Sequence, residues 1–295
     1  MTFAAPSALA RAVQAEPSPG RLQWLAQLPG TVAELTDWWG LVVGAPFEPG
    51  GQTAWVAPAT DASGRDVVLK VGWAHFEAAQ RRMGCRPGTA RARVLLRDSY
   101  RVGDTAALLL ERCRPGTPLS VLPEPEQDRV VADLLARLWQ APPAAGVFRP
   151  LQTMCQAWVA EFHHRRAVLP ADAPVIDPGL ARAATELFVA LSAPAEDDVL
   201  LCTDLHAGNV LAAEREPWLV IDPKPFAGDR CYDVLQHMLN CEERLAGDPT
   251  GLTQRMAGLL GLDGDRVRHW LFARCVLEGV GEPALQGIAA ALAPD

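Results

Sequence analysis

Two short stretches of the sequence gather residues that could act chemically on a charged group. Residues 202–209 read "CTDLHAGN" and residues 218–225 read "WLVIDPKP". Asp204 and Asn209 follow one apolar run, and Asp222 ends another. A carboxylate can accept a hydroxyl proton, and carboxylate and amide oxygens are ligands that Mg²⁺ accepts. The three residues therefore suit phosphoryl transfer, with Asp204 taking the proton while Asn209 and Asp222 hold Mg²⁺ on nucleotide phosphates.

The order of these residues bears on a simpler interpretation. Taken singly, Asp204 and Asn209 would be turn residues, and Asp222 would cap the loop before Pro223. Taken together, they repeat the D-x-x-x-x-N arrangement of the protein-kinase catalytic loop, followed by an aspartate where the metal ligand stands. Each also follows a predicted strand, so we favour the functional interpretation.

A second requirement of phosphoryl transfer is a cation for the nucleotide phosphates. The run "VVLKV" places Lys70 on a predicted strand, where a lysine could contact the α- and β-phosphates of ATP. A lysine between aliphatic residues is more often at a sheet edge or on the surface. The glycine-containing hairpin around Lys70 favours the phosphate-binding role.

The elements that must position these residues follow from hydrophobic periodicity. Helical spacing of Leu and Trp marks residues 19–41, and the next two runs, "GGQTAWVAPAT" and "GRDVVLKVGW", predict a β-hairpin. A buried strand over residues 106–113 ends at "RPGTP". Beyond it we expect helices in "EPEQDRVVADLLARLWQ", "TMCQAWVAEFHHRRAVL", "GLARAATELFVAL" and "DVLQHMLNCEERL", and short strands in "DDVLLCTD", "NVLAA" and "WLVID".

This order of elements predicts an α+β protein of two lobes, with a cleft between them. The N-terminal lobe, residues 1–113, would be small and β-rich and would bind the nucleotide. The C-terminal lobe, residues 114–295, would be mostly helical and would carry catalysis and substrate binding. A chain of 295 residues is long enough for two packed units.

Composition and charge exclude several classes of protein. The formal net charge of −8 argues against nucleic-acid binding and favours a cationic small-molecule partner. We find no apolar run long enough to cross a membrane and no secretory leader, so we expect a cytoplasmic protein. The seven cysteines are scattered without a C-x-x-C pair and are expected to be buried apolar residues. His163 and His164 are expected on a solvated helix face rather than on a metal.

The stretch "LLCTDLHAGNVLAAEREPWLVIDPKPFAGDRCYDVLQHMLN" resembles the aminoglycoside phosphotransferase family, in particular the branch of streptomycin 6-phosphotransferase and hydroxyurea phosphotransferase. "VVLKV", "ALLLERCRPGTPL" and "GDRVRHWLFARCVLEG" fit the same branch, so the resemblance runs from about Val56 onward. It implies a protein-kinase-like bilobal fold and an ATP- and Mg²⁺-dependent enzyme that phosphorylates a hydroxyl group of a small molecule.

The resemblance also implies roles for single residues. Asp204 would be the catalytic base, and His206 would orient the catalytic loop through hydrogen bonds. Asn209 and Asp222 would bind Mg²⁺. Asp233 would brace the loop, and a further role as the N-cap of the helix that follows it is compatible with this.

In the N-terminal lobe the resemblance points to two nucleotide-binding segments. Gly50, Gly51 and Gln52 match the nucleotide loop, but "PGGQT" lacks the full G-x-G-x-x-G pattern and could be any β-turn. Glu111 and Cys113 match the hinge, where backbone groups would bind adenine. Their side chains carry little information for that reason.

Streptomycin is the acceptor that this resemblance favours. Its guanidinium groups would meet acidic side chains, for which Glu242, Glu243 and Glu278 are candidates. Two alternatives remain open: an enzyme acting on hydroxyurea, another aminocyclitol or a metabolite, and a nucleotide-binding pseudokinase.

One segment departs from the pattern of the family. Where a helix with a glutamate and a Trp-Asp-Gly turn is expected, residues 80–93 read "QRRMGCRPGTARAR", with Arg81 in place of the glutamate. With GC-rich codons, a shifted frame beginning in codon 80 would read Glu-Ala-Asp-Gly-Leu-Pro-Ala-Trp-Asp. Our hypothesis is a short compensated frame change or a sequencing error, leaving an irregular segment in which Glu77 pairs with Lys70 or with Arg81.

Overall fold

The computed structural model describes residues 3, 5–73, 91–140, 147–170 and 174–294. The chain divides into two compact units, of which the first comprises Met1–Cys85 and Arg93–Gly116 and the second Arg86–Ala92 and Thr117–Asp295. The predicted division after residue 113 remains a prediction. Among the described residues, no helix is long and apolar enough to cross a membrane.

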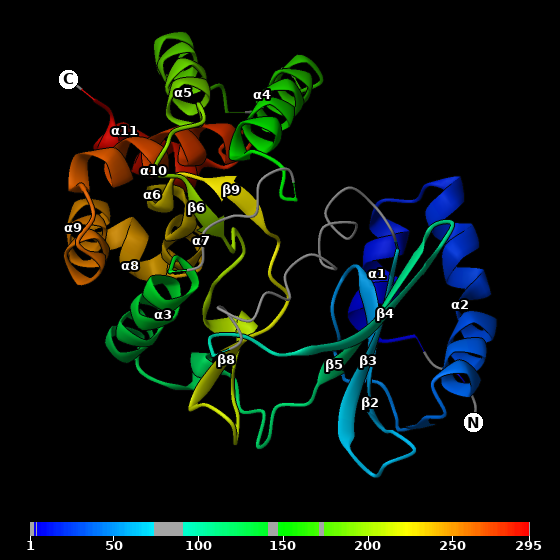
Figure 1. Ribbon diagram of the computed structural model, residues 1–295. Coiled ribbons are helices and arrows are strands. Elements are labelled where there is room, and N and C mark those ends of the chain that lie inside the picture. The colour runs from blue at the N-terminus through cyan, green and yellow to red at the C-terminus, as the bar shows by residue number, and fades with distance from the viewer. Residues whose placement is uncertain (1–2, 4, 74–90, 141–146, 171–173, 295) are drawn as a thin grey trace. The chain divides into compact units, whose positions relative to one another are not determined.

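The first unit is built on a five-stranded antiparallel sheet in the order β1-β2-β3-β5-β4 (Figure 1). Two helices precede the sheet. The helices are α1 (Ser7–Ala15) and α2 (Pro19–Trp38), and the strands are β1 (Val42–Val43), β2 (Ala54–Thr60), β3 (Asp66–Trp73), β4 (Leu96–Val102) and β5 (Thr105–Glu111).

Helix α2 begins where the sequence supplies a cap. The hydroxyl of Ser18 accepts a hydrogen bond from the backbone N–H of Arg21, and Pro19 occupies the first turn, where its missing N–H costs no hydrogen bond. The buried side chains of α2 recur every three or four residues, from Trp24 through Leu28 to Leu35. They pack on the face of the sheet formed by alternate residues of β2, β3 and β5.

The second unit is mostly helical, with two small antiparallel sheets, β6-β9 and β7-β8. Its helices are α3 (Glu124–Leu138), α4 (Leu151–Ala167), α5 (Pro178–Leu191), α6 (Arg230–Asp233), α7 (Leu235–Leu239), α8 (Glu242–Gly247), α9 (Pro249–Leu260), α10 (Gly264–Glu278) and α11 (Pro283–Leu292). Its strands are β6 (Val199–Leu201), β7 (Val210–Ala212), β8 (Trp218–Val220) and β9 (Phe226–Gly228), and its 3-10 helices are η3 (Leu119–Val121) and η4 (Ala207–Asn209).

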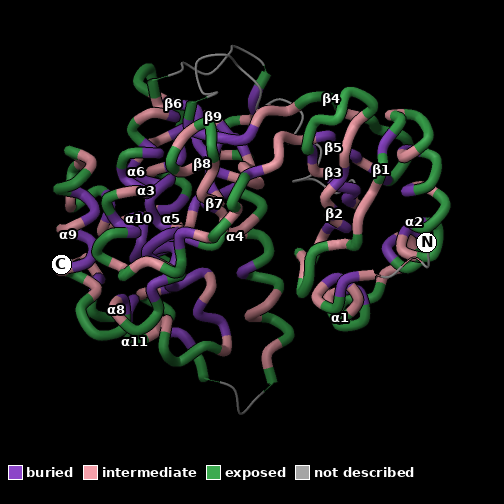
Figure 2. The backbone as a smooth tube through the Cα atoms, turned by 90° about the horizontal axis from the view of Figure 1, so that it is seen from below, coloured by how far each residue is buried: buried purple, intermediate pink, exposed green. Residues whose placement is uncertain are grey.

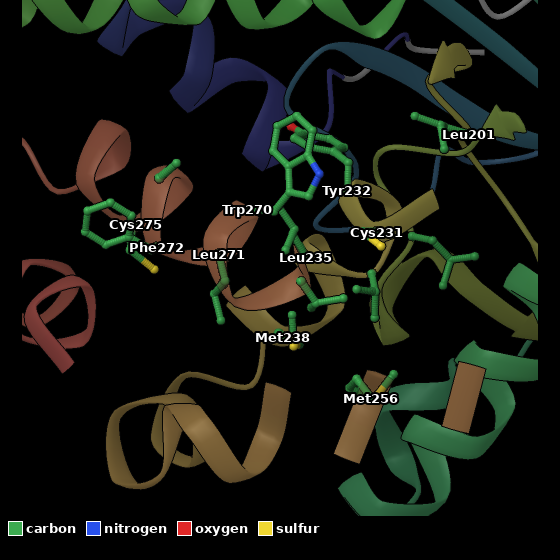
Figure 3. Close-up of a cluster of buried hydrophobic side chains, with 14 of the residues drawn as sticks. Leu201, Cys231, Tyr232, Leu235, Met238, Met256, Trp270, Leu271, Phe272 and Cys275 are labelled. Carbon is green, nitrogen blue, oxygen red and sulfur yellow. The ribbon is translucent and has the colours of Figure 1, made fainter. Parts of the chain in front are cut away.

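Helix α10 forms the centre of the second unit and is buried along much of its length (purple in Figure 2). Figure 3 shows Trp270 of α10 beside Tyr232 of α6. Their rings meet edge to face at 5.0 Å, and Phe188 of α5 meets Trp270 in the same way at 5.4 Å. Edge-to-face contacts of this kind hold aromatic rings in fixed orientations. The core therefore gives the loops after β6 and β8 a rigid base.

Most predicted elements are present, and the differences have physical causes. The sequence analysis missed β4, because its residues "LRDSYRV" are mostly exposed and lack an apolar face. An edge strand with polar side chains on both faces shows no hydrophobic alternation in the sequence. The single helix expected in "DVLQHMLNCEERL" is wrong, since α7 ends at Leu239 and α8 begins at Glu242. Residues 80–90, including Arg81, and Glu77 lie outside the described residues, so the hypothesis on that segment remains a hypothesis.

Candidate active site

The residues predicted to form the catalytic loop lie in the second unit at the ends of its short strands. Asp204 follows β6, and Asn209 closes the 3-10 helix η4 directly before β7. Strand β7 pairs with β8 so that Val210 faces Val220, and the N–H of Ile221 donates to the carbonyl oxygen of Asn209 at 2.8 Å. This hairpin brings Asp222 next to Asn209. The structure thus brings Asp222 to Asn209, which precedes it by thirteen positions, and to the segment that carries Asp204.

The side-chain amide of Asn209 is oriented by Asp204. Its NH₂ group donates to the carbonyl oxygen of Asp204 at 3.0 Å and lies 3.4 Å from Oδ2 of the same residue. The amide oxygen of Asn209 therefore remains to bind a cation. Together with the carboxylate of Asp222 it forms a set of hard oxygen donors, which fits Mg²⁺.

His206 holds the loop in shape. Its Nδ1 accepts a hydrogen bond of 3.2 Å from the N–H of Gly208 and so caps η4. Burial lowers the pKa of His206, which favours the neutral imidazole that can accept this bond. A side chain at position 208 would place its Cβ 2.9 Å from His206 Cε1, so a residue larger than glycine would displace the imidazole ring.

Asp233 braces the same loop from α6. Its buried carboxylate accepts hydrogen bonds from the backbone N–H groups of Cys202 and Thr203 at 2.6 to 2.9 Å, and from the indole of Trp139 at 3.0 Å. No side-chain cap is formed at the start of α7. These hydrogen bonds agree with the expected bracing role, whereas the compatible role as a helix cap is not seen at α7. Burial raises the pKa of the Asp233 carboxyl to about 6, although the three hydrogen bonds oppose this rise.

Lys70 occupies the central strand of the first unit. It lies on β3 between Val56 of β2 and Leu108 of β5, and the residue is only 9% exposed. An edge or surface position is therefore wrong. By strand alternation, Lys70 lies on the face opposite to Leu69 and Val71, which pack in the core.

The glycine loop before β2 is tightly built. Gly50 has a φ of 76°, and a side chain there would place its Cβ 2.5 Å from Pro6. Gly51 has no such restriction. The guanidinium of Arg21 donates to the carbonyl oxygen of Gln52 at 3.0 Å, so α2 supports this loop. The sequence analysis missed Arg21, since nothing in its local pattern indicates the contact.

Part of the predicted hinge already forms hydrogen bonds within the first unit. The backbone N–H of Glu111 donates to Leu95 at 2.8 Å, and its carboxylate accepts from the N–H of Leu95 at 2.9 Å. The N–H of Glu111 is therefore already used within the sheet. Cys113, two residues on, is buried.

The glutamates proposed to meet a cationic substrate differ in their surroundings. Glu242 and Glu243 are exposed at the first turn of α8, whereas Glu278 accepts hydrogen bonds from Arg274. The cysteines that the structure describes are all buried, as expected. His163 and His164 are exposed, which confirms the expected solvated face.

Comparison with known proteins identifies the family. Residues 41–283 match the model of the aminoglycoside/hydroxyurea antibiotic resistance kinases. The chain belongs to this family. A hydroxyurea phosphotransferase of Kitasatospora aureofaciens is 37% identical over 86% of this chain and 73% of its own length. A streptomycin 6-kinase of Streptomyces glaucescens is 32% identical over 92% of this chain and 89% of its own. These relatives confirm the predicted resemblance and the enzyme class of small-molecule phosphotransferases.

Solved structures confirm the fold of this antibiotic resistance kinase. A choline kinase of Streptococcus pneumoniae superposes with a TM-score of 0.58 at 12% identity, covering 90% of this chain and 99% of the other. A thermostable mutant of aminoglycoside phosphotransferase APH(4)-Ia, in complex with ADP and hygromycin B, gives 0.56 at 18% identity over 88% and 96%. The predicted α+β, protein-kinase-like bilobal fold is therefore confirmed.

Proposed function

We propose that this kinase transfers the γ-phosphoryl group of ATP to a hydroxyl group of streptomycin. The observation that carries the proposal is the juxtaposition of Asp204, Asn209 and Asp222 by the β7–β8 hairpin. A base and two oxygen ligands on adjacent segments meet the needs of phosphoryl transfer, in which positioning and charge stabilisation supply most of the catalysis.

The proposed reaction assigns one role to each residue. The hydroxyl oxygen of the acceptor forms a bond to the γ-phosphorus, the bond from that phosphorus to the β–γ bridging oxygen breaks, and ADP leaves with the electron pair. The carboxylate of Asp204 accepts the hydroxyl proton. Asn209 and Asp222 would hold Mg²⁺, which neutralises charge on the phosphate oxygens when bound.

Residues of the first unit are proposed to bind the nucleotide. Lys70 would contact the α- and β-phosphates, and the backbone around Gly50 and Gly51 would cover the phosphates. The backbone at Cys113 would bind adenine, for which the N–H of Glu111 is already used. The solved relative with bound ADP supports a nucleotide of this kind.

The acceptor is proposed from similarity and charge. Two streptomycin 6-kinases are 32% and 34% identical to the chain. The chain carries a net charge of −8, which suits a cationic antibiotic. Glu242 and Glu243 remain the acidic candidates for the guanidinium groups, because Glu278 is already paired. We propose that the reaction takes place in the cytoplasm.

Hydroxyurea is the second candidate acceptor. The observation in its favour is the 37% identity to a hydroxyurea phosphotransferase over most of the chain. Hydroxyurea is small and uncharged, so the acidic residues proposed to meet streptomycin would have no partner on it. The ranking of acceptors in one assay separates the two proposals.

The test measures transfer to a panel of acceptors with Mg·ATP. We expect streptomycin to gain the mass of one phosphoryl group, and Asp204→Asn to lower turnover by roughly 10²- to 10⁴-fold with unchanged ATP affinity. Asp197→Asn, at an exposed aspartate of the same unit, serves as the charge-matched control. Nucleotide binding without transfer to any acceptor would indicate a pseudokinase, and wild-type turnover of Asp204→Asn would remove Asp204 from the mechanism.

A further inference from the structure

Lys224 is fixed on the catalytic loop through its backbone. Its N–H donates to the carbonyl oxygen of Cys202 at 2.9 Å, and its carbonyl oxygen accepts from the hydroxyl of Thr203 at 2.6 Å. These bonds lie just beyond the end of the β6–β9 ladder, where Leu201 pairs with Phe226. The residue is therefore held beside the segment that carries Asp204.

The side chain of Lys224 reaches the proposed base. Its Nζ lies 3.1 Å from Oδ2 of Asp204, and the two side chains are 26% and 18% exposed. The same Oδ2 lies 3.4 Å from the amide nitrogen of Asn209. The carboxylate of Asp204 is thus oriented by two donors. His206, the basic residue inside the loop, is turned toward Gly208 instead.

Composition shows that a lysine at this position is unusual for the chain. Of its 27 lysine and arginine residues only two are lysines, Lys70 and Lys224. Arginine presents a broad planar fork that can bind both oxygens of a carboxylate, whereas lysine presents a compact point charge with three rotatable donors. A compact ammonium has three donors and can therefore contact a second anion in addition to one carboxylate oxygen.

We propose that this second anion is the phosphoryl group in transit, and that Lys224 is a catalytic residue. This inference rests on the proposed phosphoryl transfer. A hydroxyl held by Asp204 lies about 2.6–3.2 Å from the carboxylate, and the attacked phosphorus lies about 3–3.5 Å beyond it. An ammonium already in contact with Asp204 is within reach of the phosphoryl oxygens. It retains its three protons and stabilises the negative charge that these oxygens carry during transfer.

The alternative is a purely structural ion pair that only orients Asp204. Both roles predict slower turnover on removal of the charge, so turnover alone does not separate them. Contact with the γ-phosphate predicts in addition that Lys224 strengthens the binding of a triphosphate over a diphosphate. A purely structural ion pair has no effect on the ratio of triphosphate to diphosphate affinity.

The experiment compares wild type, Lys224→Met and Arg182→Met in the full chain. Met keeps the length of the side chain and removes the charge, and Arg182 is an exposed cation on α5 that serves as the control. Dissociation constants for AMP-PNP and ADP in the presence of Mg²⁺ come from calorimetry, turnover from release of ADP, and folding from thermal unfolding. Should Lys224→Met fail to fold, Lys224→Gln is measured in the same way.

We expect Lys224→Met to fold, to lose turnover by roughly 10²- to 10³-fold, and to bind AMP-PNP about tenfold more weakly with ADP affinity unchanged. The control should match wild type. An unchanged ratio of AMP-PNP to ADP affinity, in a variant that folds, overturns the inference even if turnover falls. Failure of wild type to bind nucleotide or to transfer phosphate overturns the proposed function and this inference with it. An active wild type beside a fully active Lys224→Met overturns the inference alone.

Discussion

At the scale of single residues, Asp222 combines a charged side chain with a backbone that few residues adopt. Its φ is 53°, in the left-handed region, and Thr203 on the neighbouring loop has the same value. Such conformations cost about 1–3 kcal/mol each and persist where surrounding contacts impose them. At Thr203 the contacts are visible, since its N–H donates to Asp233 and its hydroxyl donates to Lys224.

We predict that Asp222→Ala abolishes Mg²⁺-dependent turnover, because it removes the carboxylate after β8 that we propose as a Mg²⁺ ligand. Asp222→Asn is the matched variant, since asparagine tolerates the left-handed backbone and removes only the charge. Both variants should lose the binding of Mn²⁺ with AMP-PNP, measured by electron paramagnetic resonance. Only the alanine variant should also lose stability. Undiminished Mn²⁺ binding in both would exclude Asp222 as a ligand.

At the scale of elements, helix α6 supports the catalytic loop through the carboxylate of Asp233, which can titrate. Asp233 has a pKa of about 6 in the folded chain against 3.8 for an ordinary aspartate. Since the folded state holds the proton more tightly, this group stabilises the fold below pH 4. The contribution is lost as the pH rises through 6.

The predicted consequence is a difference in pH dependence between wild type and Asp233→Asn, whose residue 233 does not titrate. The free energy of unfolding of wild type, minus that of the variant, should fall by about 2 kcal/mol between pH 4.5 and 7. Chemical denaturation at several pH values measures it. A difference that rises with pH would mean that the hydrogen bonds from Cys202 and Thr203 outweigh burial.

The segment of residues 80–89 carries a second prediction at this scale. Replacing it with the peptide of the shifted frame restores a glutamate where Arg81 stands, and removes a cation that would repel Lys70. We expect the KM for ATP to fall about tenfold, equivalent to about 1.4 kcal/mol of recovered pairing. The codons of the gene test the origin separately, because codons that cannot encode Glu-Ala-Asp in the shifted frame exclude a frame change. An unchanged KM would show that Glu77 already pairs with Lys70.

At the scale of the whole molecule, each unit has its own core, and the second is tied together by a buried ion cluster. Asp128 of α3 is fully buried and contacts His237 of α7 at 2.9 Å, Arg244 of α8 at 3.0 Å and Arg255 of α9 at 2.5 Å. Burial opposes ionisation of Asp128, but hydrogen bonds from these partners outweigh it and hold the pKa well below the usual value. Two guanidinium groups on one carboxylate also oppose a metal ion there, although Cys241 lies close by.

We predict that Asp128→Asn destabilises the second unit by about 3–5 kcal/mol, because it removes the buried carboxylate that pairs with Arg255 and His237 and leaves Arg244 with Glu124 alone. Asp133→Asn on the same helix removes an exposed carboxylate that pairs with half-buried Arg137, and should cost less than about 1 kcal/mol. Urea denaturation monitored by tryptophan fluorescence gives both values. Equal effects would show that the cluster adds no more stability than a surface ion pair.

The sequence by itself was sufficient for the parts of the molecule that depend on neighbours along the chain. The spacing of Asp204 and Asn209, the apolar strands on either side and the alternation around Lys70 are local, so their pattern predicts both the loop and the fold class. Residue-by-residue similarity to a known family then extended this pattern over residues 41–283. Asp222 comes next to Asn209 through the pairing of β7 with β8, and a hairpin of two consecutive strands is also a local structure.

Resemblance to the family predicted that Asp233 braces the catalytic loop, but tertiary structure alone decided which atoms Asp233 binds and which other side chains support this loop and the glycine loop. Lys224 contacts Asp204 from twenty positions away, Asp233 reaches Cys202 across thirty-one, and Arg21 reaches Gln52 across thirty-one. Each contact depends on how separate elements pack, which no local pattern encodes. Burial follows from the same packing, so the raised pKa of Asp233 and the ion cluster around Asp128 could not be predicted from sequence. Hydrophobic periodicity records which face of an element is covered, but not which polar group of another element lies opposite.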